Sequence, residues 1–186
     1  MKKNLKRRDF IRKAGIAGAA ATVVSSFPAP AIAAGHQEWI ICSAFGKAGL
    51  LGQAIQAFAE GINNYSEKLK IKVYHAGELV PGLESLDAVR SGAAQASYGA
   101  PYYWTNLSDA IEFVATCPFG MNAMEQNAWC YYGGGIEEAD KIYNALGLKF
   151  LPMGNTGNQM GGWFNKEINT PSDYKGLKMR MPGLGG

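Results

Sequence analysis

The sequence predicts an α/β fold in which the strands of one sheet run parallel. Short apolar segments typical of strands occur at residues 38–45, 69–75 and 94–101, and segments with helical periodicity separate them. Consecutive parallel strands require long crossover connections, which helices usually provide and which are right-handed. We therefore expect a parallel sheet that is covered by helices on both faces.

The first strand, helix and second strand are predicted from changes in the hydrophobic period. Residues 38–45 (EWIICSAF) form a largely apolar run, as a buried strand does. Apolar residues then recur at helical spacing, at positions 51, 54, 55, 58 and 62. Residues 69–75 (LKIKVYH) alternate apolar and polar side chains with the period of two expected for a strand. Strand, helix and strand in this order form the unit from which parallel sheets are built.

The next segment is predicted to add a short helix and a third strand. Residues 82–92 (GLESLDAVRSG) favour a helix that ends at Gly92. Residues 94–101 (AQASYGAP) favour a strand that Pro101 stops.

Two further helices are predicted at residues 122–132 and 136–147, with three consecutive glycines, Gly133–Gly135, between them. Phosphate binding is one interpretation of these glycines. However, no strand precedes them, and the two glutamates that follow would repel an anion. We therefore interpret them as a break between two helices.

The last segment is predicted to contain two strands, at residues 149–154 (KFLPMG) and 177–182 (LKMRMP). The sequence then ends at Gly186 after a glycine-rich turn, with no terminal helix to cover the apolar side chains of Met179 and Met181. We therefore expect the sequence to be part of a longer protein.

Residues 1–33 have the composition of an export signal. A basic segment precedes an apolar stretch, roughly residues 14–27, which is too short and too rich in small residues to span a bilayer. Arg7 and Arg8, followed by Asp-Phe-Ile, resemble the twin-arginine motif, whose pathway exports folded proteins. Cleavage is expected after Ala33. The alternative is a basic, disordered amino terminus of a cytoplasmic protein.

Removal of the signal changes the sign of the net charge. Seven of the 18 basic residues and one of the 15 acidic residues lie in residues 1–33, so the remainder has a formal charge of −3 in place of +3. The remainder contains no basic stripe, which argues against nucleic acid as a partner. With 47% hydrophobic residues overall, its 153 residues are sufficient for a core of one domain or slightly more.

The three cysteines, Cys42, Cys117 and Cys130, have neither C-x-x-C spacing nor an even count. A zinc site or a framework of disulfides is therefore not expected. We interpret them as separate buried thiols, and one disulfide with a free thiol left over is the alternative in an oxidising compartment.

The sequence lacks the residue patterns of common catalytic sites. Beyond the signal it contains two histidines, His36 and His75, and the motifs G-x-S-x-G, H-E-x-x-H and G-x-x-x-x-G-K are absent. His75 follows a predicted strand and is interpreted as a hydrogen-bonded structural residue, with a role as a ligand as the alternative. The sequence thus favours binding over catalysis.

Two polar side chains are candidates for binding a small anion. In the predicted strand at 177–182, Lys178 and Arg180 lie on the face opposite the apolar residues, and a guanidinium can hold a carboxylate through two hydrogen bonds. A surface salt bridge is the alternative role for Arg180. Gln159 lies among glycines at 157, 161 and 162, where the backbone can approach a ligand and an amide can both donate and accept.

Three adjacent aromatic residues, Tyr102, Tyr103 and Trp104, follow the third predicted strand. The cleft of an open α/β sheet lies at this end of the strands, so these rings are candidates for its wall. Packing within the core and on the surface is the alternative.

Residues 77–104, 117–135 and 154–186 closely resemble, in sequence and order, the periplasmic solute-binding subunits of TRAP transporters, specifically the branch that binds 2-oxo acids. The resemblance covers nearly all of the chain after the signal. It implies a type II periplasmic binding-protein fold, with two α/β domains around a ligand cleft. Domain I would comprise residues 34–152, and residues 153–186 would begin a truncated domain II. Such proteins are nearly twice as long as this chain.

The resemblance also implies roles for the candidate residues. Arg180 would bind the substrate carboxylate, and Gln159 would contact both the substrate and a bridging cation, which is sodium in the best-known relatives. Tyr102, Tyr103, Trp104 and Phe45 would line the side of the cleft formed by domain I. The remaining cation ligands of such relatives come from a later Glu-Trp segment that this chain does not contain.

The implied protein is not an enzyme. Its partners would be a small organic acid and the membrane permease subunits of a TRAP transporter, a homodimer is left open, and its location would be the periplasm. The alternatives within this class are a binder of lactate, of another organic acid or of a sugar-like solute. The alternative from another class is a periplasmic enzyme exported by the twin-arginine pathway.

Overall fold

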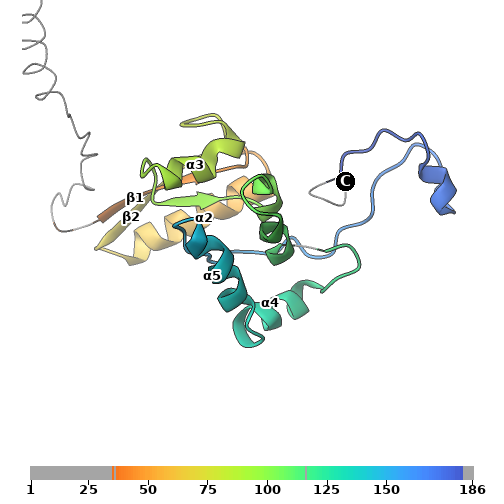
Figure 1. Cartoon of the computed structure of the whole chain (residues 1–186). Helices are drawn as coiled ribbons and strands as arrows, with labels where there is room; N and C mark the ends of the chain where they lie inside the picture. Colours follow the sequence, from red (N-terminus) through yellow and green to blue (C-terminus); the bar gives the residue numbers. More distant parts are fainter. Residues whose placement is uncertain (1–34, 36, 116, 182–186) are drawn as a thin grey trace, which may run out of the picture.

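The computed structural model describes Gly35 and residues 37–115 and 117–181 (Figure 1). The export signal predicted at residues 1–33, its cleavage after Ala33 and residues 182–186 lie outside these ranges. Within the described ranges, no helix has the length and apolar composition needed to cross a membrane.

A three-stranded parallel sheet forms the centre of the fold. β1 (Gln37–Ser43) lies between β2 (Leu69–Tyr74) and β3 (Ala96–Tyr98) and pairs in parallel with both. The first strand of the described chain is therefore the middle strand of the sheet. The predicted parallel sheet is confirmed, although its third strand is shorter than residues 94–101.

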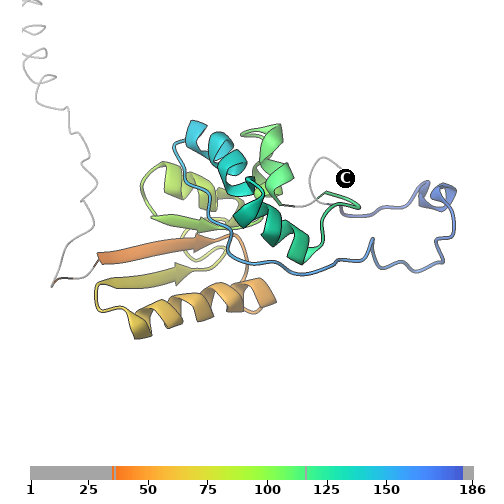
Figure 2. The ribbon, with the colours of Figure 1, turned by 90° about the horizontal axis from the view of Figure 1, so that it is seen from below.

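Two helices cover opposite faces of this sheet (Figures 1 and 2), namely α2 (Leu50–Tyr65) and α3 (Ser85–Arg90). Neighbouring residues of a strand point to opposite faces, and Ile41 and Cys42 of β1 do so. Ile41 packs toward α2, in a buried cluster with Ile55, Ala59 and Ile71. Cys42 packs toward α3, in a buried cluster with Ala88 and Ala94. Residues 37–39 are exposed, whereas the rest of β1 is covered on both faces, which explains why this part of the strand is mostly apolar.

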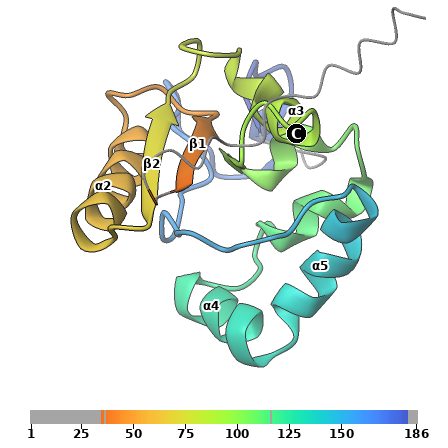
Figure 3. The same cartoon turned by 90° about the vertical axis from the view of Figure 1, so that its left-hand side faces the viewer.

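A group of helices follows the sheet. It comprises two short 3-10 helices, η2 (Pro101–Trp104) and η3 (Asp109–Val114), and two α-helices, α4 (Ala123–Tyr132) and α5 (Gly135–Ala145). α4 and α5 pack against each other (Figure 3), and η3 contacts both η2 and α5. η2, η3 and α5 share a core with α3, and its buried members are Leu86, Trp104, Ile111, Val114, Ala139 and Tyr143.

The glycines between α4 and α5 break the helix, as predicted. Gly134 has a φ of +86°, which glycine adopts more readily than other residues. A Cβ atom at Gly135 would lie 2.7 Å from the ring of Trp129, so only glycine lets the two helices approach this closely.

The strands predicted at residues 149–154 and 177–182 are wrong within the described chain. Residues 149–154 and 177–181 have no regular secondary structure, and the only element between them is the 3-10 helix η4 (Pro171–Tyr174). A strand forms only beside a partner whose backbone groups complete its hydrogen bonds, and the described residues offer these stretches none. Figures 1 and 2 instead show residues 153–181, the blue segment, as an arm that extends from the α/β body and turns back after η4.

The three cysteines are free thiols. Cys42 and Cys130 are buried, which confirms the prediction for these two, and burial raises the pKa of both thiols. Cys117 is exposed, contrary to the prediction, because it lies in the loop that precedes α4.

Candidate functional site

The carboxyl ends of β1 and β3 bring aromatic residues together at one edge of the sheet. Just beyond β1, the Ala44 N–H donates to the Tyr98 carbonyl at 2.8 Å, which holds the two strand ends side by side. Phe45 follows directly, and η2 begins three residues after Tyr98. Ligands of open α/β sheets bind at this edge, so it is the candidate site.

Five rings form a continuous group here, which we call the aromatic cluster: Phe45, Tyr98, Tyr102, Tyr103 and Trp104. The Phe45 ring lies 5.5 Å from that of Tyr98 and 5.9 Å from that of Tyr103, measured between centroids. Tyr103 in turn lies 5.1 Å from Tyr102 and 6.0 Å from Trp104. Most of these pairs are edge-to-face, a favoured arrangement of aromatic rings, so each ring restricts its neighbours.

Tyr98 belongs to this cluster but was not singled out from the sequence. It lies inside the segment predicted as a strand, where an aromatic residue indicates packing as readily as binding. Its position as the last residue of β3 was the available clue, because that position faces the carboxyl edge of the sheet.

Two phenols of the aromatic cluster, those of Tyr98 and Tyr102, have a raised pKa. Burial raises the pKa of Tyr98 and of Tyr102 above the usual value. The neighbouring Tyr103 raises the pKa of Tyr102 further, whereas the positive charge of Arg180 lowers it. Both hydroxyl groups can therefore donate a hydrogen bond at neutral pH.

Arg180 lies within electrostatic reach of the aromatic cluster, as its effect on Tyr102 shows. Its side chain is exposed, and it forms no ion pair with any carboxylate of the described residues. Leu177 and Met179 are partly buried while Lys178 and Arg180 are exposed, as the predicted alternation requires, but Met181, which was expected on the buried face, is exposed. The charge of Arg180 therefore acts on Tyr102, and the role of Arg180 as a carboxylate ligand stays a prediction.

Gln159 lies in the exposed arm and not in the aromatic cluster. Its Nε2 donates to Thr156 Oγ1 at 2.7 Å, which leaves the amide oxygen available. The arm is folded so that its two halves meet: a Cβ atom at Gly162 would lie 2.5 Å from Met179 Cε. Gln159 and Arg180 therefore stand on neighbouring stretches of the chain, three and one residues from this contact.

Trp104 differs from the other members of the cluster because it is part of the core. Only 5% of its surface is exposed, and its indole N–H donates to the Leu83 carbonyl at 2.8 Å. Core packing, the alternative considered for the three adjacent aromatic residues, therefore describes Trp104. Tyr102 and Tyr103 remain partly exposed.

His75 is buried at the end of β2, but the hydrogen bonds predicted for its ring are not formed. Neither ring nitrogen has a partner among the described residues. The backbone of His75 is held by Glu78: its N–H donates to Glu78 Oε2 at 2.8 Å, and its carbonyl accepts from the Glu78 N–H at 2.9 Å. This tight turn fixes the position of the residue without satisfying the imidazole.

The described residues contain no group of three or more histidine, cysteine, aspartate or glutamate side chains that could hold a metal ion. Gln159, the one residue that the resemblance assigns to a cation, offers one neutral oxygen. Such a donor fits a cation only as part of a larger set of oxygen ligands.

Comparison with known proteins places these features in context. Residues 44–185 match the sequence profile of DctP, described as bacterial extracellular solute-binding protein, family 7. The chain is 42% identical, over 192 residues, to a monocarboxylate 2-oxoacid-binding periplasmic protein of Nostoc sp.. This alignment covers 98% of the chain and 51% of the relative, so the chain spans about half the length of the curated relative that it matches.

Similar solved structures include two TRAP periplasmic solute-binding proteins, one from Pseudoalteromonas atlantica with bound sodium and pyruvate and one from Colwellia psychrerythraea with bound calcium and pyruvate. Each is 42% identical with a TM-score of 0.76, and the matches cover 81% of this chain and 46% and 47% of theirs. A TRAP solute-binding protein of Bordetella bronchiseptica, with copurified calcium and picolinate, is 30% identical with the same TM-score over 81% of this chain and 46% of its own.

Proposed function

Because the chain belongs to the family 7 bacterial extracellular solute-binding proteins, we propose that it forms part of a TRAP transporter receptor for a small monocarboxylate, a 2-oxo acid such as pyruvate. The observation that carries this proposal is the aromatic cluster at the carboxyl edge of the sheet, where the positive charge of Arg180 acts on Tyr102. A 2-oxo acid has a small apolar substituent and an anionic head, and this edge offers a surface for each.

The proposed division of labour follows from the chemistry of the side chains. Arg180 binds the carboxylate through its planar fork. The Tyr102 hydroxyl donates to a ligand oxygen, and Phe45 and Tyr103 contact the apolar substituent. Gln159 contributes an amide oxygen to a cation that bridges to the substrate. The bound sodium and calcium of the pyruvate-binding relatives support the cation but not its ligands in this chain.

The domain boundaries of the proposed receptor are those expected from the sequence. Residues 34–152 form domain I, and residues 153–186 begin domain II. The similar solved structures confirm the α/β fold class, and the position of the α/β body before the exposed arm supports this boundary. Closure of the two domains over the ligand would select the form that the membrane permease subunits recognise.

Delivery to the permease, location in the periplasm and export by the twin-arginine pathway complete the proposal. The family and the Nostoc relative are solute-binding proteins, which supports a binding role over catalysis. A homodimer is also proposed, on the ground that the Bordetella bronchiseptica relative is a dimer in its structure.

Calorimetric titration of the purified protein tests the proposed ligand. The panel consists of pyruvate, longer 2-oxo acids, lactate and sugars, each measured in sodium and in potassium buffer. We expect the tightest binding for a 2-oxo acid, with higher affinity in sodium. Tightest binding of lactate or a sugar would identify another solute, and consumption of a ligand, followed by NMR, would favour the alternative of an exported enzyme.

A further inference from the structure

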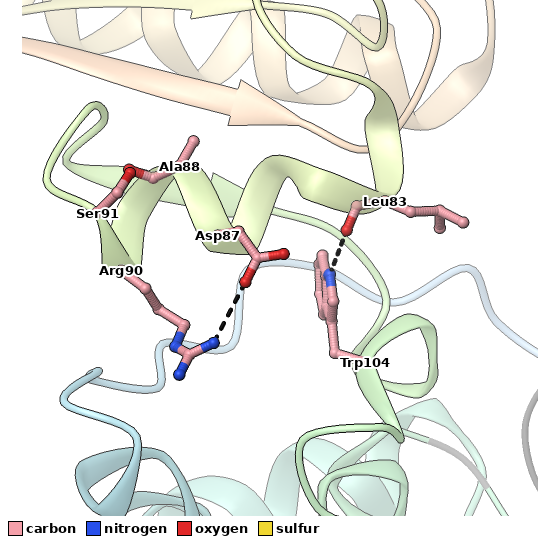
Figure 4. A network of polar contacts seen from close by, with 6 residues as sticks. All are labelled: Leu83, Asp87, Ala88, Arg90, Ser91 and Trp104. Carbon is pink, nitrogen blue, oxygen red and sulfur yellow. Dashed lines mark hydrogen bonds and ion pairs between the residues drawn. The ribbon is translucent and has the colours of Figure 1, made fainter.

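Trp104 is held in place from two sides, although it belongs to the row of aromatic residues at the candidate site. Its indole N–H donates to the Leu83 carbonyl at 2.8 Å, across the start of α3 (Figure 4). Leu83 lies in the 3-10 helix η1 (Gly82–Glu84), which leads directly into α3. The hydrogen bond therefore fixes η2 to the element that covers one face of the sheet.

Two glycines provide the room for this arrangement. A Cβ atom at Gly99 would overlap the six-membered ring of Trp104 and would lie 3.1 Å from Ala44 Cβ. A Cβ atom at Gly82 would lie 2.7 Å from the Ala44 carbonyl oxygen. The ends of β1, β3 and η1 can thus approach one another only because positions 82 and 99 carry no side chain.

The orientation of Trp104 is passed on to the exposed part of the cluster. The Trp104 ring lies 6.0 Å from that of Tyr103, and Tyr103 contacts both Tyr102, at 5.1 Å, and Phe45, at 5.9 Å. The rings of Phe45, Tyr102 and Tyr103 are partly exposed, so a ligand at the edge can contact them. Trp104 is 95% buried and its indole N–H is already used, so the same ligand does not contact it.

We infer that Trp104 is a positioning residue: it sets the orientation of the exposed rings of the aromatic cluster and thereby the size of 2-oxo acid that fits against them. This inference rests on the proposed function. The indole is fixed by Leu83 and Gly99, and it holds Tyr103 in place. Tyr103 then holds Tyr102 and Phe45. A rigid wall leaves a fixed space for the substituent of the acid, so a short substituent is favoured over a longer one.

The test compares three single variants of the purified protein. Trp104→Phe keeps an aromatic ring but removes the indole N–H, and Gly99→Ala keeps the indole but displaces it. Trp129→Phe is the matched control, because Trp129 lies in α4, where its ring packs on Gly133 and Gly135. Calorimetry gives the dissociation constants of pyruvate and of a 2-oxo acid with a longer, unbranched chain.

For Trp104→Phe and Gly99→Ala we expect pyruvate to bind about three- to tenfold more weakly, the range produced by loss of one hydrogen bond or aromatic contact. The longer acid should lose less affinity, so that the ratio of its dissociation constant to that of pyruvate becomes smaller. Trp129→Phe should leave both constants unchanged. A change of selectivity separates positioning from a general loss of stability, which would reduce the folded fraction for both acids equally.

Two outcomes would overturn the inference. In the first, Trp104→Phe and Gly99→Ala lower the melting temperature but retain the parent affinities and selectivity, which would make Trp104 a purely structural residue. In the second, folded Trp104→Phe loses all binding while Gly99→Ala binds normally, which would make Trp104 a direct ligand contact.

A ligand-free measurement keeps this inference separate from the proposed function. In protein with labelled tyrosine rings, the NMR signals of Tyr102 should move in Gly99→Ala, which retains every ring of the cluster, and not in Trp129→Phe. If the parent protein binds no 2-oxo acid but the Tyr102 signals move, the proposed ligand is wrong and the positioning contact stands. Unchanged Tyr102 signals would show that Trp104 does not set the wall.

Discussion

Arg180 is the residue on which the proposed chemistry depends most, because it supplies the positive charge that acts on Tyr102 of the aromatic cluster. Arg180→Lys keeps this charge but loses the planar fork, and Arg180→Ala leaves a bound carboxylate without a partner. We expect the lysine variant to lose roughly 1 to 3 kcal/mol of binding free energy for pyruvate, and the alanine variant more. Calorimetry measures the loss.

The melting temperature without ligand supplies the control for Arg180, since an exposed residue without an ion pair among the described residues contributes little to stability. Parent-like affinity of Arg180→Ala, combined with a clearly lower melting temperature, would identify a structural salt bridge instead. Gln159→Ala should cost less affinity but should weaken the dependence of binding on sodium.

The buried imidazole of His75 leads to the prediction that a substitution increases stability. A buried polar group without a hydrogen bond costs about 1 to 3 kcal/mol, so replacing it by an apolar side chain removes a penalty. We expect His75→Leu to raise the free energy of unfolding by about 1 kcal/mol, measured by urea denaturation. Ser85→Ala is the contrasting control, because it removes the 3.0 Å hydrogen bond that Ser97 Oγ donates and should lower stability. A loss of stability in His75→Leu would reveal a partner of the imidazole.

The sequence could locate most of the site at residue level but not the function of each side chain. Tyr102 and Tyr103 could be placed because the carboxyl ends of parallel strands meet at one edge, whereas Phe45 was implied only by the family resemblance. The burial of Trp104 could not be predicted, since a run of three aromatic residues does not show which of them a 3-10 helix directs into the core. The unpaired ring of His75 is likewise a property of its surroundings and not of its sequence neighbours.

Among the helices and strands, α4 has the clearest sequence signal for where it begins. The Asn122 side chain accepts from the backbone N–H groups of Met124 and Glu125, both at 3.0 Å, and the Glu125 carboxylate accepts from the Asn122 N–H at 2.8 Å. This reciprocal capping box satisfies backbone donors that the first turn of a helix leaves free. Both residues are exposed, so the effect of a substitution reflects the cap and not core packing.

Asn122→Ala is therefore expected to lower the free energy of unfolding by about 1 kcal/mol, measured by urea denaturation. Asn127→Ala is the matched control, because Asn127 is exposed in the middle of the same helix, where alanine is the better helix former. Equal stability of Asn122→Ala and the parent protein would show that α4 does not depend on this cap.

Helices and strands differed in how well the sequence predicted them. α2, α4 and α5 formed where predicted, because helical periodicity is a local property of the sequence. β1, β2 and β3 also formed, since each finds its partner within 62 residues of chain. The strands predicted at residues 149–154 and 177–182 did not form in the described chain, because pairing depends on distant segments that alternation alone does not identify.

At the scale of the whole molecule, the structure divides into a compact α/β body and an exposed arm. Residues 153–181 contain only the short helix η4, and most of their side chains are exposed. In hydrogen exchange of the 186-residue chain, we expect the amides of this arm to exchange rapidly while those of β1 and α2 are protected. Uniform protection up to residue 181 would contradict the described separation of body and arm.

The proposed route of export is also a property of the whole molecule, since the twin-arginine pathway accepts folded proteins. Replacing both Arg7 and Arg8 by lysine preserves the charge but removes the guanidinium pair. We expect the precursor to remain in the cytoplasm, measured by cell fractionation and immunoblotting. Normal appearance of the double variant in the periplasm would exclude this route.

Because β1 is the middle strand of the sheet, the signal has to be cleaved at an accurate position. Many domains tolerate the loss or extension of a few terminal residues, because their first residues lie in a tail or an edge element. Here β1 begins at Gln37, four residues after the proposed cleavage position at Ala33, and it pairs with a strand on each side. A signal peptidase that cut only a few residues too late would therefore remove hydrogen bonds from the middle of the sheet.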